Sequence, residues 1–176
     1  MKERKGIAKF GGQDQTIVGD DIQVGQTAPE FTLHTHDWKS FSGLGSTEGK
    51  VRVFASLPSI KTPICDRETR RFNEEAASLG DNVVIITIST DLPFSLANWC
   101  GQHGIDQVVV ASDHVATEFG AKYGCLMKEW RILRRAVFVV DQHDTVVYAD
   151  YMPHAGHEPN YEAVLDAVRQ ARATEG

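Results

Sequence analysis

The chain has 176 residues, 41% of them hydrophobic and 24% charged, which is ordinary for one soluble domain with a substantial core. Its formal net charge of −6 argues against a nucleic-acid-binding surface. No apolar segment has the length of a secretory signal or of a membrane span, so we expect a cytoplasmic protein without a membrane partner. Three cysteines are too few for a disulfide-stapled secreted domain.

The first third of the chain has short strand patterns separated by polar turns. Residues 7–18 alternate weakly around a Gly-Gly turn and predict an N-terminal β-hairpin. Short strand candidates follow at 31–33 and 39–41. These elements come before the main alternation of strands and helices.

The middle of the chain alternates strand and helix patterns. Residues 51–57 predict a buried strand, and a helix follows from Thr62 to about Leu79. The β-branched run at 83–88 is typical of a strand buried on both faces of a parallel sheet. Asp91 is expected to cap a second helix that ends near residue 102, and residues 108–110 form the next strand.

The last third predicts a short helix, a hairpin and a closing helix. The short helix is expected over 113–123, and the stretch 126–132 has no clear assignment. Strands at 135–140 and 145–150 form the hairpin, and the closing helix runs from about Asn160 to Ala173. The order predicts one α/β domain over residues 1–176, with a central mixed sheet flanked by helices.

Cys65 is the best nucleophile candidate in the chain. Thr62 is a good N-cap, Pro63 suits the first helical position, and Cys65 then falls at the third. Unpaired backbone N–H groups and the positive end of the helix dipole should lower the pKa of its thiol. The alternative is a buried structural cysteine beside an ordinary helix start.

The residues around Cys65 carry a family resemblance. Pro58, Thr62 and Cys65 match the Pro-x-x-x-Thr-x-x-Cys signature of peroxiredoxins. The chain resembles one branch in particular, the atypical two-cysteine thiol peroxidases of bacteria. Ordered agreement continues over the segments APEFTL (28–33), RFN (71–73), ISTDLPF (88–94), WC (99–100), RAV (135–137) and EPNY (158–161).

The resemblance implies a thioredoxin-like fold and a thiol-dependent peroxidase. Cys65 would attack alkyl hydroperoxides or hydrogen peroxide and become a sulfenic acid. The donors to the peroxide oxygen would be Arg135, the Thr62 hydroxyl and the backbone N–H of Cys65, with Pro58 shielding the sulfur. Arg135 is preferred to Arg134 because the family's arginine directly precedes the Ala-Val of the strand.

By the same resemblance Cys100 is the resolving cysteine. It would form an intramolecular disulfide with Cys65, and thioredoxin would reduce it, in a homodimer that needs no metal, haem, flavin or bound nicotinamide. The alternative for Cys100 is a small buried residue behind Trp99. Cys125 lies where the family pattern does not require cysteine and is interpreted as structural, the alternative being a second resolving thiol or a regulatory one.

Three points bear on this interpretation: one sequence departure, a possible metal site and a competing function. Lys61 stands where the family usually has Asp. The histidine pairs 34/36 and 154/157 lack the cysteine or carboxylate partners of a metal site. A competing function is a redox switch that uses Cys65 and Cys100 without turnover, although such a switch has no need of Pro58, Thr62 or Arg135.

Overall fold

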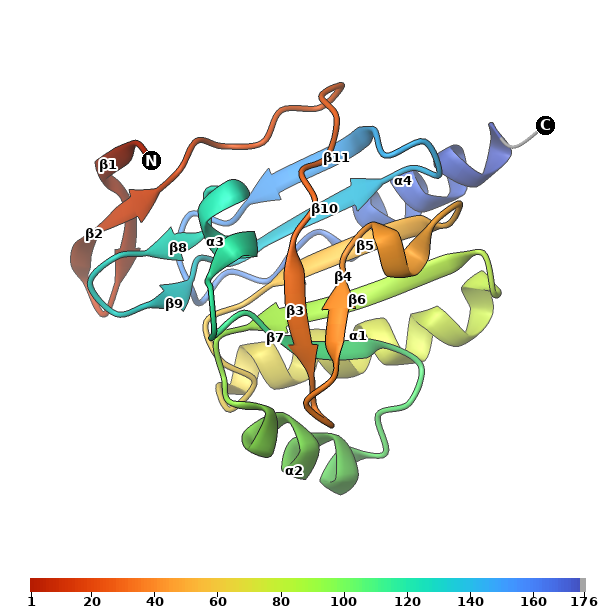
Figure 1. Cartoon of the computed structure of the whole chain (residues 1–176), viewed down its shortest axis with the longest axis horizontal. Helices are drawn as coiled ribbons and strands as arrows, with labels where there is room; N and C mark the ends of the chain where they lie inside the picture. The colour runs from red at the N-terminus through yellow and green to blue at the C-terminus, as the bar shows by residue number, and fades with distance from the viewer. Residues whose placement is uncertain (175–176) are drawn as a thin grey trace.

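A computed structural model describes residues 1–174, so the last two residues of the domain expected over 1–176 lie outside it. Its centre is a seven-stranded sheet in the order β11-β10-β5-β6-β7-β3-β4 (Figure 1). The strands are β3 (Thr32–Thr35), β4 (Ser40–Ser42), β5 (Val51–Ser56), β6 (Val83–Ser89), β7 (Val109–Ser112), β10 (Ala136–Val140) and β11 (Val146–Tyr151). The strands β5, β6 and β7 are parallel and the other neighbours antiparallel, which confirms the predicted mixed sheet.

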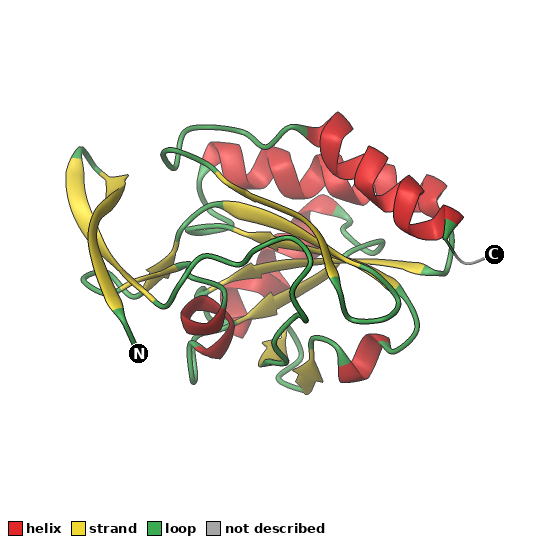
Figure 2. Ribbon diagram, turned by 90° about the horizontal axis from the view of Figure 1, so that it is seen from above, coloured by secondary structure: helices red, strands yellow, loops and turns green. Residues whose placement is uncertain are grey.

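Side-chain alternation along the central strands divides the core between the two faces of the sheet. On one face Val53 packs against the helices α1 (Pro63–Leu79) and α4 (Tyr161–Ala173). On the other face Phe54 packs near Phe119 of the short helix α3 (Glu118–Lys122). Figure 2 shows the two longest helices together on one side of the sheet. Among the described residues, no helix is both long enough and apolar enough to cross a membrane.

The N-terminal hairpin belongs to a second, smaller sheet. Its strands are β1 (Glu3–Phe10) and β2 (Gln13–Val18), so the first strand begins earlier than expected. The sheet continues through β8 (Leu126–Met127) and β9 (Ile132–Leu133), which fall, apart from Leu133, in the stretch that had no sequence assignment. A parallel bridge between Lys9 and His154 ties the hairpin to the loop after β11.

The remaining helices differ from the sequence expectations at their starts. Helix α2 (Pro93–His103) has Leu92 as its N-cap without a side-chain cap bond, so the prediction that Asp91 caps it was wrong. The helix expected over 113–123 is shorter and begins only at Glu118. The Asp113 carboxylate accepts hydrogen bonds from the backbone N–H groups of Phe119 and Gly120 in its first turn. One 3-10 turn, η1 (Gly45–Thr47), precedes β5.

Candidate active site

The helix start at Cys65 has the predicted geometry. Strand β5 leads into a short loop, Thr62 is the N-cap of α1, and Pro63 occupies the first turn. The Thr62 hydroxyl oxygen accepts a hydrogen bond from the Cys65 backbone N–H at 3.3 Å and donates one to the Ser59 carbonyl at 3.2 Å. Cys65 is fully buried.

Asp91 fixes the loop that precedes this helix. One carboxylate oxygen accepts from the Ser59 hydroxyl at 2.7 Å, and the other accepts from the Ile60 N–H at 2.8 Å. The second oxygen also accepts from the Ser89 hydroxyl at the end of β6. The side chain that was expected to cap α2 therefore joins the active-site loop to the neighbouring strand.

Arg135 contacts the Cys65 sulfur directly. It lies immediately before β10, where its Nη2 is 2.9 Å from Cys65 Sγ and its Nε donates to the Ala155 carbonyl at 3.0 Å. Its third nitrogen, Nη1, pairs with the Glu68 carboxylate. Arg134 points elsewhere, with Nη1 3.0 Å from Asp21, so the choice of Arg135 over its neighbour agrees with the geometry.

Glu68 is a site residue that the sequence interpretation missed. Its side chain is 1% exposed and lies one helical turn after Cys65 on the same side of α1. Burial raises the pKa of the Glu68 carboxyl to about 7, although Arg135 acts in the opposite direction. Burial by itself lowers the pKa of Arg135, but Glu68 and the Cys65 sulfur outweigh it, so Arg135 stays charged. The spacing of three residues between Cys65 and Glu68, which places both on one side of a helix, was the sequence signal that could have identified Glu68.

An apolar cavity of about 310 Å³ lies over this cluster. Arg135 is the one charged group among the described residues that line it, and Phe10 reaches it from the tip of the N-terminal hairpin. The full lining is Phe10, Pro58, Thr62, Pro63, Ile64, Arg135, Ala155 and Gly156. Cys65 itself is fully buried and does not line the cavity, but the Arg135 guanidinium, which does, lies 2.9 Å from its sulfur.

The predicted resolving cysteine lies in a different place. Cys100 is in α2, in a buried cluster with Ile60, Leu96 and Trp99, and it lines a separate cavity of about 240 Å³. Burial raises the pKa of its thiol. All three cysteines are free. The structure therefore brings together Pro58, Thr62, Cys65 and Arg135, but it leaves Cys100 outside this group.

Cys125 has the properties of a structural residue. It is fully buried, and its sulfur is 3.5 Å from the Tyr123 carbonyl. Burial raises the pKa of its thiol to about 12. A thiol in such an environment stays protonated and unreactive near neutral pH.

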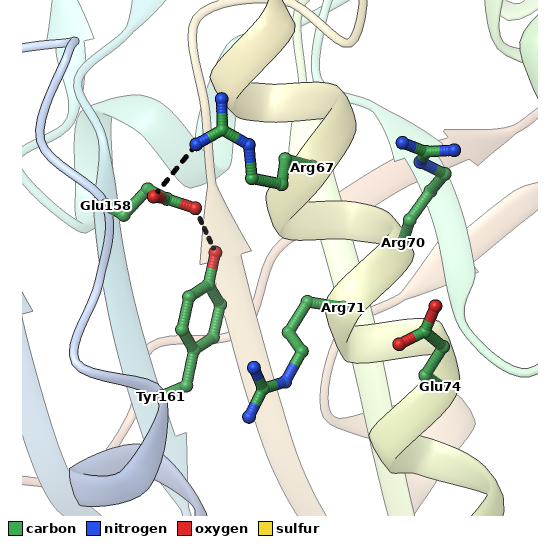
Figure 3. Close-up of a pocket in the computed structure, with 6 residues that line it drawn as sticks. All are labelled: Arg67, Arg70, Arg71, Glu74, Glu158 and Tyr161. Atoms are coloured by element: carbon green, nitrogen blue, oxygen red, sulfur yellow. Dashed lines mark hydrogen bonds and ion pairs between the residues drawn. The ribbon is translucent and has the colours of Figure 1, made fainter.

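A third pocket lies along α1 and is lined mostly by charged side chains (Figure 3). Arg67 pairs with Glu158 at 3.2 Å, and the Tyr161 hydroxyl donates to the same carboxylate at 3.1 Å. The Arg71 guanidinium lies 5.1 Å from the centre of the Tyr161 ring. The segments RFN and EPNY, which carried part of the family resemblance, thus meet between α1 and α4 and support the helix that holds Cys65.

Comparisons with known proteins show which family the chain belongs to. The Redoxin family pattern matches residues 23–165. The thiol peroxidase of Bacillus subtilis (strain 168) is 48% identical over 160 residues, covering 91% of this chain and 95% of that protein. The thiol peroxidase of Streptococcus pneumoniae (strain ATCC BAA-255 / R6) is 43% identical over 163 residues, covering 93% and 99%.

The solved structures confirm the expected fold. A peroxiredoxin-like protein from Aquifex aeolicus superposes with a TM-score of 0.86 at 34% identity, covering 95% of this chain and 98% of that one. A thiol peroxidase from Chromobacterium violaceum has the same fold, with a TM-score of 0.81 at 21% identity and coverage of 95% and 97%. The chain therefore has a thioredoxin-like peroxiredoxin fold, and it belongs to the Redoxin family, among the thiol peroxidases of the peroxiredoxin group.

Proposed function

We propose that this peroxiredoxin-type peroxidase reduces hydroperoxides at Cys65 and resolves the product with Cys100. In the first step the Cys65 thiolate attacks the terminal peroxide oxygen and the O–O bond breaks. The leaving oxygen takes a proton and departs as an alcohol or water, and Cys65 becomes a sulfenic acid. The observation that carries this proposal is the Arg135 guanidinium, which lies 2.9 Å from the Cys65 sulfur and also lines an apolar cavity.

Arg135 is the donor already directed at the reacting sulfur. A fixed cation stabilises the thiolate and the negative charge that develops on the leaving oxygen, and low-dielectric surroundings strengthen the effect. Thr62 and the Cys65 N–H, the other donors that the resemblance assigns, are bonded to each other at 3.3 Å. That long hydrogen bond is the one we expect to be exchanged for bonds to the peroxide oxygens when substrate enters.

The cavity wall supports organic hydroperoxides as substrates together with hydrogen peroxide. Phe10, Pro58, Pro63 and Ile64 offer apolar surface to an alkyl substituent, and hydrogen peroxide needs only Arg135 and the sulfur. Both kinds of peroxide are therefore part of the proposal.

The second step would join the two cysteines. The Cys100 sulfur would attack the Cys65 sulfenic acid, forming the S–S bond and releasing water, and thioredoxin would then reduce the disulfide. Burial favours the protonated Cys100 thiol while α2 is closed, so this step requires α2 to open. The homodimer implied by the family belongs to the proposal too, and sedimentation of the reduced protein tests it.

The test follows NADPH consumption with thioredoxin, thioredoxin reductase and cumene hydroperoxide. We expect turnover by the wild type, none by Cys65→Ser, and a single peroxide reduction by Cys100→Ser, with the sulfenic acid trapped by dimedone. A wild type that forms the disulfide without turnover would favour the redox switch or another reductant. A wild type whose Cys65 does not react with either peroxide would overturn the proposal.

A further inference from the structure

One hydrogen bond connects the neighbours of the two cysteines. Asp66 follows Cys65 in α1, and Trp99 precedes Cys100 in α2. The Trp99 indole Nε1 donates to Asp66 Oδ1 at 2.8 Å, although only 2% of Trp99 is exposed. The bond therefore links the helix that begins at the reactive thiol to the helix that carries the second one.

The Asp66 carboxylate is held in place for this bond. Arg70 Nε lies 3.4 Å from its other oxygen, and His103 Nε2 lies 3.5 Å from the oxygen that accepts from Trp99. The His103 ring also packs on the Trp99 ring, with centroids 4.8 Å apart. Trp99 and His103, on the same face of α2, thus both contact the Asp66 carboxylate of α1.

Helix α2 depends on such contacts to stay folded. It has 11 residues, no side-chain cap at its N-terminus, and a left-handed glycine, Gly104, at its end. Helices of this length are marginal in water without tertiary packing. The buried face of Leu96, Trp99 and Cys100 provides apolar packing, and Asp66 adds a hydrogen bond to a charged acceptor.

We propose that Asp66 is a positioning residue for the resolving step. Through its hydrogen bond with Trp99 it holds α2 closed and thereby sets the rate at which Cys100 reaches Cys65. The inference rests on the disulfide proposed above. In that step the Cys100 thiol gives up its proton, its sulfur bonds to the Cys65 sulfur, and the S–O bond of the sulfenic acid breaks. The departing hydroxide takes the proton and leaves as water.

In the closed arrangement the two sulfurs are not bonded and have different neighbours. Cys65 Sγ faces Arg135, whereas Cys100 lines the other cavity beside Phe41 and Ile105. A disulfide needs the two sulfurs at bonding distance, so the segment around Cys100 has to move. Trp99 is the adjacent residue, and it has to leave Asp66 when the segment unwinds.

The first measurement needs no peroxide. In reduced Cys65→Ser protein, the rate at which iodoacetamide alkylates Cys100 reports how often α2 opens. Asp66→Ala should raise this rate about tenfold, because a hydrogen bond to a charged acceptor shifts an equilibrium by about that factor or more. Asp66→Asn keeps an acceptor oxygen for the indole but not its charge, so its rate should lie between those of the unmodified protein and Asp66→Ala.

The second measurement separates the two chemical steps. After rapid mixing with one equivalent of hydrogen peroxide, Asp66→Ala should form the disulfide about tenfold faster, whereas sulfenic acid formation should change less than about threefold. Faster resolution should also lower the fraction of Cys65 oxidised to sulfinic acid at high peroxide. A role confined to the stability of α1 would not produce this separation.

Two further variants make the test specific. Trp99→Phe removes the donor while keeping a ring in the cluster, so it should reproduce the effect of Asp66→Ala even if the latter folds poorly. Glu74→Ala removes an exposed acid from the same helix and should change nothing. Alkylation in Asp66→Ala and Trp99→Phe that stays at the unmodified rate would overturn the inference. Absence of any Cys65 oxidation in the wild type would instead refute the proposed function.

Discussion

Replacing Arg135 by lysine keeps the charge of the side chain but removes its fork of nitrogens. In the native site, separate nitrogens contact Cys65 Sγ, the Glu68 carboxylate and the Ala155 carbonyl. A lysine ammonium is a single point of charge on a flexible stem. We expect it to pair with Glu68, because a buried carboxylate without a partner is the most costly of the three groups to leave alone.

The size of the effect follows from the contact that is lost. A hydrogen bond to a charged group contributes about 1.5–3 kcal/mol, so the oxidation of Cys65 should slow by about 10- to 150-fold. Loss of the bond to the Ala155 carbonyl should cost about 1 kcal/mol of folding stability. Arg135→Ala should be far less stable, by about 3–5 kcal/mol, because it leaves Glu68 buried and unpaired.

The assay measures the second-order rate of Cys65 oxidation by hydrogen peroxide in a single turnover, together with the free energy of unfolding in urea. Arg134→Lys is the matched control, since Arg134 contacts Asp21 and lies 4.3 Å from the centre of the Tyr151 ring, away from the sulfur. A rate for Arg135→Lys within about threefold of wild type would show that any nearby cation suffices, and would refute the role assigned to the fork.

Three other outcomes follow from the structure. Phe10→Ala should lower the rate with cumene hydroperoxide about fivefold through lost apolar contact and leave the rate with hydrogen peroxide unchanged. Phe10→Leu should restore the rate with cumene hydroperoxide, and equal losses with both peroxides would contradict the prediction. Burial raises the pKa of Asp113 to about 6 from 3.8, so the native state binds its proton first. Between pH 7 and pH 4 the wild type should therefore gain about 2 kcal/mol of stability relative to Asp113→Asn. Urea unfolding at both pH values checks the sign, and a loss of relative stability at pH 4 would contradict the reasoning. Cys125→Ala should keep full peroxidase turnover at a cost of about 1 kcal/mol in stability, and a loss of activity would show that the thiol takes part in the reaction.

The sequence predicted those parts of the site that depend on local rules. Thr62 and Pro63 begin α1 because capping and a fixed proline φ act within one turn, and strand β6 follows from its continuous β-branched run. The contact of Arg135 with Cys65 was expected only through the family resemblance. No pattern within the chain brings together two residues that are 70 positions apart.

The missed features depend on partners that are distant in sequence. A glutamate in a helix is normally solvated, and Glu68 is buried only because Arg135, 67 residues further along, pairs with it. Asp91 has the residue type and position of a helix cap, but the backbone and hydroxyl groups of the active-site loop compete for its carboxylate. Asp113 shortens α3 in the same way, by bonding to amides six and seven residues later.

The buried pair of Glu68 and Arg135 also limits what a mutational screen can reveal. Removing either partner alone leaves the other group buried without its partner, so single substitutions at these positions should reduce the amount of folded protein before catalysis is measured. A library selected only for folding, in cells never exposed to peroxide, should therefore retain both residues. Intolerance at position 135 is thus not by itself a sign of chemistry, and only a paired library that varies positions 68 and 135 together can separate the two requirements.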